Sequence, residues 1–249
     1  MNKGTYTVVS NERIAAAGIW KMILRATSSG PASDFDDFRP GQFVNLALKG
    51  HYLRRPISVC DWDCGGRTLT LVYRVVGAGT KDMSCYTVGT EMDVLTGLGN
   101  GFTLEGRKPL LVGGGVGLPP MLALAKAFLE RGIRPIVAAG FADKDAVILE
   151  KEFAGLGLGL HIATMDGSAG AKGTVMNVID RLDYDYIYAC GPKPMLKALS
   201  TLEVPAQLSV EERMGCGYGV CMGCTCKTAD GFKRVCKDGP VFKKEVLVW

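Results

Sequence analysis

A group of cysteines near the C-terminus constrains this chain more than any other feature. The stretch "RMGCGYGVCMGCTCKT", residues 213–228, holds four cysteines and four glycines, and Cys236 follows it. Cys216, Cys221 and Cys224 form a C-x4-C-x2-C pattern, and eleven residues separate Cys224 from Cys236. This spacing is typical of plant-type [2Fe–2S] clusters, which are held by four cysteine thiolates. The sequence therefore predicts a [2Fe–2S] module with these four cysteines as ligands.

The glycines between the cysteines favour the same interpretation. Gly215, Gly217, Gly219 and Gly223 allow positive φ and a close approach of the backbone, so that N–H groups can point at the sulfurs. The main alternative is structural zinc, which four cysteines can also hold. Zinc ribbons usually carry two C-x2-C knuckles, whereas this chain has one of the right kind. Cys226 is a possible third ligand, but the x2 spacing after Cys221 favours Cys224 in that role. We therefore expect that Cys226 does not bind the cluster.

Length and composition place few restrictions on the chain. A chain of 249 residues predicts two or three domains, and a net charge of +4 from scattered basic residues gives no support to nucleic-acid binding. The N-terminus lacks the pattern of a signal peptide. The most apolar region, "LLVGGGVGLPPMLALAKAF", is interrupted by glycines and two prolines and makes a poor membrane span. We expect a cytoplasmic protein without membrane partners, in which clustered thiols bind metal or act in catalysis.

The N-terminal part reads as a run of short strands. Residues 1–102 contain "TYTVVS", "GIWKMILRA", "GQFVNLALK", "RRPISVC" and "RTLTLVYRVV", separated by Gly and Asp. In the last of these, Leu69, Leu71, Tyr73 and Val75 alternate onto one face. Many short strands with turn signals predict a small antiparallel β-barrel.

The middle part changes to an alternation of strands and helices. Residues 103–205 predict helices at "PPMLALAKAFLERG", "KDAVILEKEFAG", "GTVMNVIDRL" and "PKPMLKALSTL", with short apolar strands between them. Such alternation predicts a doubly wound parallel sheet with helices on both faces. Residues 206–249 form a small tail with too few residues for a hydrophobic core of its own. Such a tail needs a further stabilising group, and a cofactor bound by the cysteines is the candidate. Its end, "GPVFKKEVLVW", is a strand packed on the tail or, less favoured, a partner contact through Phe242 and Trp249.

Four further stretches suggest nucleotide binding, although each is weak alone. In "LRRPISVC", Arg55 offers a planar guanidinium to a phosphate, while the plain interpretation is a surface strand with basic residues. In "VVGAGTKDM", glycines precede a short helix whose free N–H groups attract anions, or simply make a turn. The stretches "LLVGGGVGLPPM" and "YACGPKPM" follow predicted strands, and parallel sheets bind ligands at the carboxyl ends of their strands.

These motifs together resemble a known superfamily. "PGQF", "RRPIS", "GAGT", "GGGVGLPPM" and "CGPKPM" occur in the order found in the ferredoxin–NADP reductase superfamily. Within it, "CGYGVCMGCTCKT…VCKDGPVF" is similar to the electron-transfer subunits of class 1B dihydroorotate dehydrogenases. The resemblance covers essentially the whole chain. It implies a barrel that binds FAD, an α/β domain that binds NAD, and a [2Fe–2S] module, with limits at 1–102, 103–205 and 206–249.

The resemblance also implies site residues. Relatives often have an aromatic residue where this chain has Ile57, so we expect Tyr73 to stack on the flavin instead. The implied FAD contacts are Arg55, Pro56, Ile57, Ser58, Val72, Tyr73, Arg74, Gly79 and Thr80. The implied nicotinamide-site residues are Gly114, Gly115, Gly117, Cys190, Gly191 and Pro192.

Acidic residues favour NAD over NADP. Relatives that use NADP hold its 2′-phosphate with an arginine pair after the strand that here reads "AAGFA". This chain has Asp143 and Asp145 there, on either side of Lys144. Carboxylates repel a phosphate and can accept a hydrogen bond from a ribose hydroxyl.

The implied activity is that of one subunit of an NAD-linked oxidoreductase of pyrimidine biosynthesis. A partner subunit oxidises dihydroorotate at its FMN, and electrons pass through the cluster and FAD to NAD, in a heterotetramer with two copies of each chain. No catalytic side chain is predicted, and His51 and His161 receive no role. One alternative is a reductase subunit with a ferredoxin, sulfide or hydrogenase partner. Some of these relatives have aspartate as the first cluster ligand, so Cys216 favours the pyrimidine enzyme. Another is a zinc-stapled binding module that has lost its flavin.

Overall fold

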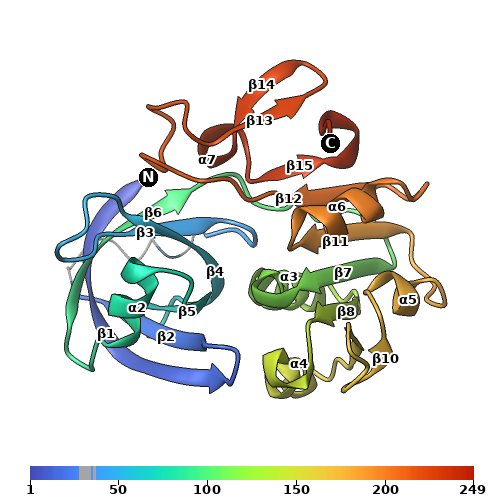
Figure 1. The fold of residues 1–249 in the computed structure, drawn as a ribbon, viewed down its shortest axis with the longest axis horizontal. Helices are drawn as coiled ribbons and strands as arrows, with labels where there is room; N and C mark the ends of the chain where they lie inside the picture. The colour runs from blue at the N-terminus through green and yellow to red at the C-terminus, as the bar shows by residue number, and fades with distance from the viewer. Residues whose placement is uncertain (28–34, 36–37) are drawn as a thin grey trace.

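The computed structural model describes residues 1–27, 35 and 38–249. It contains a closed β-barrel, a seven-stranded sheet flanked by helices, and a two-stranded hairpin (Figure 1). The barrel and the α/β part lie side by side, and the C-terminal segment lies across the top of both (Figure 1). This arrangement confirms the predicted fold class.

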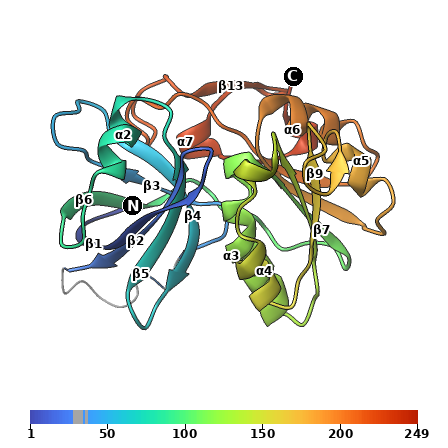
Figure 2. The same ribbon diagram turned by 60° about the horizontal axis from the view of Figure 1, so that its bottom comes forward.

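The barrel is antiparallel, with the strand order β1-β2-β5-β4-β3-β6. Its core includes Leu69, Leu71 and Tyr73 from a single strand, with Val75 packed against them, which confirms the predicted alternation. A short helix, α2, follows that strand and lies over the barrel (Figure 2). The elements are β1 (Asn2–Ala15), β2 (Ile19–Ala26), β3 (Phe43–Leu46), β4 (Arg55–Asp63), β5 (Thr68–Arg74), α2 (Ala78–Ser84) and β6 (Glu91–Leu98).

The large sheet has the order β10-β9-β8-β7-β11-β12-β15 and is parallel except at the β15 edge. Leu111 of β7 packs with Phe128 of α3, whereas Leu110 and Val112 pack with Leu196 on the opposite face. Helices therefore cover both faces, as predicted. The strands are β7 (Pro109–Gly114), β8 (Ile136–Phe141), β9 (Leu160–Thr164), β10 (Ala171–Lys172), β11 (Tyr186–Cys190), β12 (Ala206–Ser209) and β15 (Val241–Lys243). The helices between them are η1 (Gly115–Gly117), α3 (Pro119–Glu130), η2 (Lys144–Ala146), α4 (Glu150–Gly155), α5 (Met176–Ile179) and α6 (Lys193–Ser200).

Two predicted helices are shorter than expected. The stretch 144–155 splits into η2 and α4, because the Asp143 carboxylate accepts from Ala146 N at 3.1 Å and Leu149 takes a left-handed φ of 62°. The stretch 173–182 keeps only α5. There Gly173 has a φ of 114° and the Asn177 side chain accepts from Thr174 N, which ties the residues before the helix into a turn.

The C-terminal segment is joined to both larger parts. Strand β12 pairs with β11 and β15 pairs with β12, so the sheet continues past the predicted boundary at residue 206. Phe242 is buried on β15, which confirms the packing interpretation for that residue. The remaining elements are β13 (Thr225–Thr228), β14 (Gly231–Arg234), α7 (Val235–Asp238) and η3 (Lys244–Val246). In the described part of the chain, every helix is too short or too polar to cross a membrane.

Candidate cofactor-binding sites

The four predicted cluster ligands lie in two linked pairs. Cys216 N donates to Cys221 Sγ and Cys221 N donates to Cys216 Sγ, both at 3.4 Å. Cys236 N donates to Cys224 Sγ, also at 3.4 Å. Backbone amides therefore point at the sulfurs of Cys216, Cys221 and Cys224, as the glycine-rich loop predicts. Such bonds stabilise thiolates and tune a cluster's reduction potential.

The two pairs differ in their electrostatics. Burial opposes ionisation of Cys216, but hydrogen bonds from the amides of Cys221, Tyr218 and Val220 outweigh it and lower the Cys216 pKa to about 6. Burial raises the Cys236 pKa to about 12, together with its hydrogen bond to Cys224. Binding of a cation would stabilise all four cysteines as thiolates, including the buried Cys236.

The buried pair joins the C-terminal segment to the barrel. Cys224 and Cys236 are 1% and 2% exposed and share a core with Phe43, Leu98 and Phe242. Among the residues that the structure describes, no three His, Cys, Asp or Glu side chains are arranged to hold a single metal ion. The donor set of four thiols with amides at their sulfurs fits a [2Fe–2S] cluster.

The glycine prediction is correct for two of four positions. Gly217 and Gly219 have φ values of 77° and 90°. Gly215 and Gly223 do not adopt positive φ, but a Cβ on either would lie 3.3 or 3.6 Å from Cys221 Sγ. Gly215 and Gly223 therefore provide space beside a ligand sulfur rather than an unusual backbone conformation.

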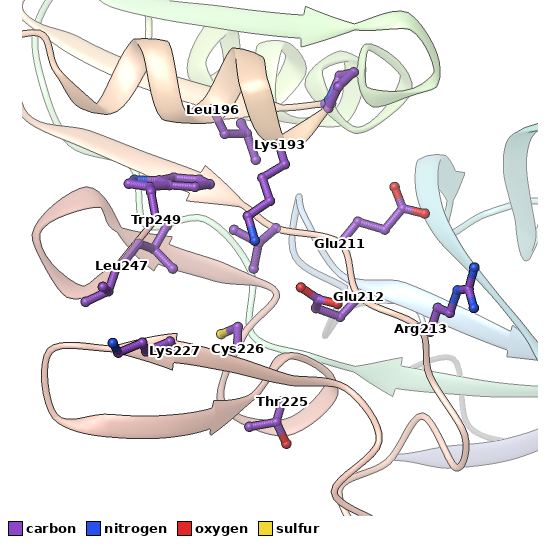
Figure 3. Close-up of a pocket in the computed structure, with 14 residues that line it drawn as sticks. Lys193, Leu196, Glu211, Glu212, Arg213, Thr225, Cys226, Lys227, Leu247 and Trp249 are labelled. Atoms are coloured by element: carbon purple, nitrogen blue, oxygen red, sulfur yellow. The ribbon is translucent and has the colours of Figure 1, made fainter.

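Cys226 stands apart from this network. It lies on β13, takes part in none of the three amide–sulfur hydrogen bonds, and lines a cavity of about 450 Å3. Figure 3 shows Lys193 extending from the start of α6 toward Glu212 and Cys226. Because Gly191 and Pro192 also line this cavity, it connects the predicted nicotinamide loop with the cluster hairpin.

The predicted FAD residues of β4 and α2 are in contact. A Cβ on Gly79 would lie 2.2 Å from Arg55 Nε, so the guanidinium covers this glycine. The Thr80 hydroxyl accepts from Val76 N at 2.9 Å and Gly77 N at 3.2 Å and so organises the turn into α2. A guanidinium beside the first turn of a helix is a suitable site for a phosphate.

The structure adds a residue that the sequence analysis left without a role. His51 Nδ1 accepts from Arg55 Nη2 at 3.1 Å, and His51 Nε2 lies 2.6 Å from Asp82 Oδ2. Because a guanidinium only donates, the proton of neutral His51 is on Nε2 and is donated to Asp82. Asp82 is 31 residues from His51 in the chain, so no local pattern announces the pair.

The expected stacking role of Tyr73 does not agree with its position. The ring is 2% exposed in the barrel core, and its hydroxyl donates to Asn11 Oδ1 at 3.0 Å. Burial raises the Tyr73 pKa above its usual range. A ring packed on all sides has no free face for a flavin, so any FAD contact of Tyr73 involves its main chain. Val72 packs toward α3 and Arg74 is exposed.

The predicted nicotinamide residues converge where the sheet reverses its strand order, between β7 and β11. A Cβ on Gly114 would lie 2.6 Å from Pro192 Cδ, and a Cβ on Gly117 would lie 2.2 Å from Cys190 O. A Cβ on Gly191 would lie 2.9 Å from Gly114 N and Gly114 Cα. The two loops therefore need glycine in order to pass each other at the switch point, where sheets of this kind bind dinucleotides.

Two acidic residues, Asp143 and Asp166, follow neighbouring strands of the sheet. Asp143 lies two residues beyond β8, and its carboxylate also caps η2. Asp166, just beyond β9, accepts from the amide and hydroxyl of Ser168, and these bonds lower its pKa. Asp143 can be predicted from the sequence alone, whereas Asp166 becomes its neighbour only through the parallel pairing of β8 with β9.

Comparisons with known proteins agree on one family. Residues 211–248 match the family model described as the iron-sulfur cluster binding domain of dihydroorotate dehydrogenase B. The chain is similar to the dihydroorotate dehydrogenase B (NAD(+)) electron transfer subunit of Geobacillus sp. (strain WCH70), with 47% identity over 84% of this chain and 86% of that protein. The same subunit of Bacillus cereus (strain B4264) is 41% identical over 94% of this chain and 95% of that protein.

Solved structures give the same picture of the fold. A chain of the NADH-dependent reduced ferredoxin-NADP oxidoreductase structure is 31% identical, with a TM-score of 0.87 over 98% of this chain and 90% of that one. The FAD/NAD-binding domain of nitric oxide dioxygenase from Vibrio cholerae is 17% identical, with a TM-score of 0.65 over 79% of this chain and 90% of that one. At this lower identity the likeness concerns the fold alone.

Proposed function

Because the chain belongs to the family of dihydroorotate dehydrogenase B (NAD(+)) electron transfer subunits, we propose that it passes electrons from dihydroorotate oxidation to NAD. Dihydroorotate is oxidised on a partner subunit that carries FMN. The route through this chain runs over a [2Fe–2S] cluster and FAD. It makes the chain one component of an NAD-linked oxidoreductase of pyrimidine biosynthesis in the cytoplasm.

The observation that carries this proposal is the junction of the cysteine segment with the barrel. Cys224 and Cys236 share a core with Phe43 of β3 and Leu98 of β6. Strand β3 pairs with β6 on one side and on the other with β4, the strand of Arg55. The same segment lines the cavity that reaches Gly191 and Pro192. Contact of the cysteine segment with both the barrel and the loop at Gly191 supports a relay of electrons between the proposed sites.

The side chains of this protein bind and orient the carriers. Cys216, Cys221, Cys224 and Cys236 hold the cluster, and their backbone amides stabilise the thiolates. Arg55, oriented by His51, and the first turn of α2 bind the FAD phosphates, and Pro56, Ile57, Ser58, Val72, Tyr73, Arg74, Gly79 and Thr80 complete the FAD contacts. Bound FAD supplies the exchange between hydride and single-electron transfer.

The nicotinamide substrate is held at the switch point of the sheet. Gly114, Gly115 and Gly117 approach it from β7, and Cys190, Gly191 and Pro192 from β11. Asp143 accepts from the adenosine ribose and repels a 2′-phosphate, which makes NAD the substrate. We assign the limits 1–102, 103–205 and 206–249 to the FAD, NAD and cluster modules, with β12 and β15 completing the sheet of the second.

Exposed apolar side chains on the cluster segment support a partner on that side. Val220 is 77% exposed and Phe232 is 70% exposed, and Tyr218 and Met222 are also exposed. Apolar side chains grouped around a redox centre mark an interaction surface. We assign this face to the FMN-containing catalytic subunit, in a heterotetramer with two copies of each chain.

The test is NAD reduction driven by dihydroorotate, without oxygen, by this chain purified from its host with its partner. The proposal predicts NADH formation, together with a co-purified FMN protein. If dihydroorotate produces no NADH while flavin and iron are present, the assignment of the partner is wrong.

A second candidate is a reductase subunit that exchanges electrons with ferredoxin. It is favoured by the likeness to the NADH-dependent reduced ferredoxin-NADP oxidoreductase chain over 98% of the sequence. Under this alternative, reduced ferredoxin and not dihydroorotate drives NAD reduction in the same assay.

A further inference from the structure

A buried polar side chain links the barrel to the first cluster ligand. Asn45 is 1% exposed and lies in β3 among Val44 and Leu46, which are fully buried. Its Nδ2 donates to the carbonyl oxygen of Cys216 at 3.0 Å. A buried asparagine in an apolar strand is costly unless its polar atoms have partners, and the described residues of the barrel supply none for this amide nitrogen.

The loop is shaped to receive this side chain. A Cβ on Gly217 would lie 2.3 Å from Asn45 Nδ2, and Gly217 has a φ of 77°. Both the missing side chain and the left-handed backbone allow the chain to approach Asn45 directly after the Cys216 ligand. The buried side chain of Asn45 and the glycine at position 217 are therefore both required for this contact.

Asn45 also lies beside the predicted FAD strand and is fixed there. It pairs with Pro56 in the β3–β4 ladder, one residue from Arg55. Its carbonyl oxygen accepts from Arg54 Nη1 at 3.2 Å, and Arg54 Nη2 donates to Asp93 Oδ1 at 2.9 Å. One residue thus contacts the flavin-binding strand through its main chain and the cluster loop through its side chain.

One atom of Asn45 has no partner within the described residues. Asn45 Oδ1 is buried and accepts no hydrogen bond there, although buried amide oxygens normally do. The hydrogen bond from Nδ2 to Cys216 O is therefore the side-chain hydrogen bond that fixes Asn45 among the described residues.

We propose that Asn45 is the positioning residue that fixes the cluster relative to FAD, by holding the Cys216 carbonyl against the flavin-binding strand. The proposal rests on the function proposed above. The test runs the proposed route in reverse. NADH would give a hydride to FAD bound beside Arg55, and FAD would release a proton to solvent and pass two electrons, one at a time, through the cluster to an added one-electron acceptor. No bond to the protein forms or breaks.

The test compares Asn45→Leu and Asn45→Ala with wild type in the holo chain. Both variants remove the donor to Cys216 O. Asn100→Leu is the matched control, because Asn100 Nδ2 also donates from the barrel side to a carbonyl of the cluster segment, that of Asp238, at 3.1 Å. Stopped-flow absorbance without oxygen follows flavin reduction by NADH and cluster reduction separately. The EPR spectrum and reduction potential of the cluster are measured in each variant.

We expect flavin reduction at the wild-type rate in all variants, with cluster reduction slowed about ten- to hundredfold in the Asn45 variants alone. The cluster EPR spectrum changes in these variants and not in Asn100→Leu. Cluster reduction at the wild-type rate in an Asn45 variant with full iron and flavin content overturns the inference. If Asn45→Leu does not fold, Asn45→Ala decides. A wild-type chain in which NADH never reduces the cluster contradicts the proposed function instead, so the two failures are distinguishable.

Discussion

The cluster loop and the flavin pocket build their sites in opposite ways. The cluster ligands lie within 21 residues, Cys216 to Cys236, and are oriented by amides of their own segment. The flavin pocket is assembled by side chains from separate elements, with Arg55 on β4, Asp82 on α2 and His51 between β3 and β4. A site made from one local segment can be recognised from its sequence pattern, and it no longer binds its cofactor when one ligand is removed. At a site made from distant side chains, each substitution weakens cofactor binding by a limited factor.

The largest expected effect is the loss of the cluster without loss of FAD. Cys224→Ser removes a buried ligand, so the iron content and the transfer of electrons to a partner fall by more than about 10²-fold. FAD binding and NADH oxidation by ferricyanide, which draws electrons from the flavin, remain. Iron and flavin analysis with the two activity assays measures this. Cys226→Ser is the control, because Cys226 lies outside the amide–sulfur network, and loss of iron in that variant would contradict our ligand assignment.

A glycine in the flavin pocket gives the next effect. In Gly79→Ala the new Cβ would lie 2.2 Å from Arg55 Nε, so the guanidinium moves and FAD affinity falls about tenfold or more. Equilibrium titration of the apo chain with FAD measures the change, and the cluster keeps its iron. Gly77→Ala is matched, because a Cβ there meets no atom within 4 Å. Equal loss of affinity in both variants would show that the turn, and not the contact with Arg55, matters.

A smaller effect tests the orientation of Arg55. His51→Ala removes the acceptor for Arg55 Nη2, and Asp82→Asn weakens the hold on His51. We expect about threefold to tenfold weaker FAD binding in either variant, the size of one hydrogen bond. Because both act through Arg55, the double variant is less than additive. Additive losses in a double-mutant cycle would separate Asp82 from the FAD site.

The smallest effect concerns pH and the cluster loop without iron. Folding lowers the Cys216 pKa to about 6 from the ordinary thiol value of 9.0. A depressed pKa stabilises the fold fully above the unfolded value, and this stability is lost as pH falls through the folded one. The thiol is half-exposed, so screening limits the change to about 2 °C in Tm between pH 9 and pH 6. Because thiols with raised pKa values, such as Cys236, act in the opposite sense, thermal unfolding of the apo chain is compared between wild type and Cys216→Ser at both pH values. We expect the difference in Tm, wild type minus Cys216→Ser, to be larger at pH 9 than at pH 6. A difference that is larger at pH 6 would contradict the sign.

The sequence predicts those parts of the molecule that depend on local pattern. The alternation of Leu69, Leu71 and Tyr73 gives the barrel face, and the glycines before α3 give the switch point. The split of 144–155 was missed because Leu149 adopts a left-handed conformation that no local propensity favours. The stacking role expected of Tyr73 failed because its hydroxyl finds Asn11 on β1, a partner 62 residues away.

Partners that are distant in sequence also explain what was missed in the sites. His51 and Asp82 meet only after the barrel has closed, and Asn45 meets Cys216 across 171 residues. Neither pair leaves a spacing that can be read along the chain. The cysteine motif could be recognised from the sequence because its ligands are neighbours both in sequence and in space.

The most direct test of the account is the addition of NADH to the holo chain alone, without oxygen, followed by EPR of the cluster. The account predicts that the signal of a reduced [2Fe–2S] cluster appears in the wild type and is absent when FAD has been removed. Reconstitution with FAD restores it. A cluster that NADH leaves oxidised in the FAD-loaded chain, or that NADH reduces without FAD, would contradict the relay between the two sites.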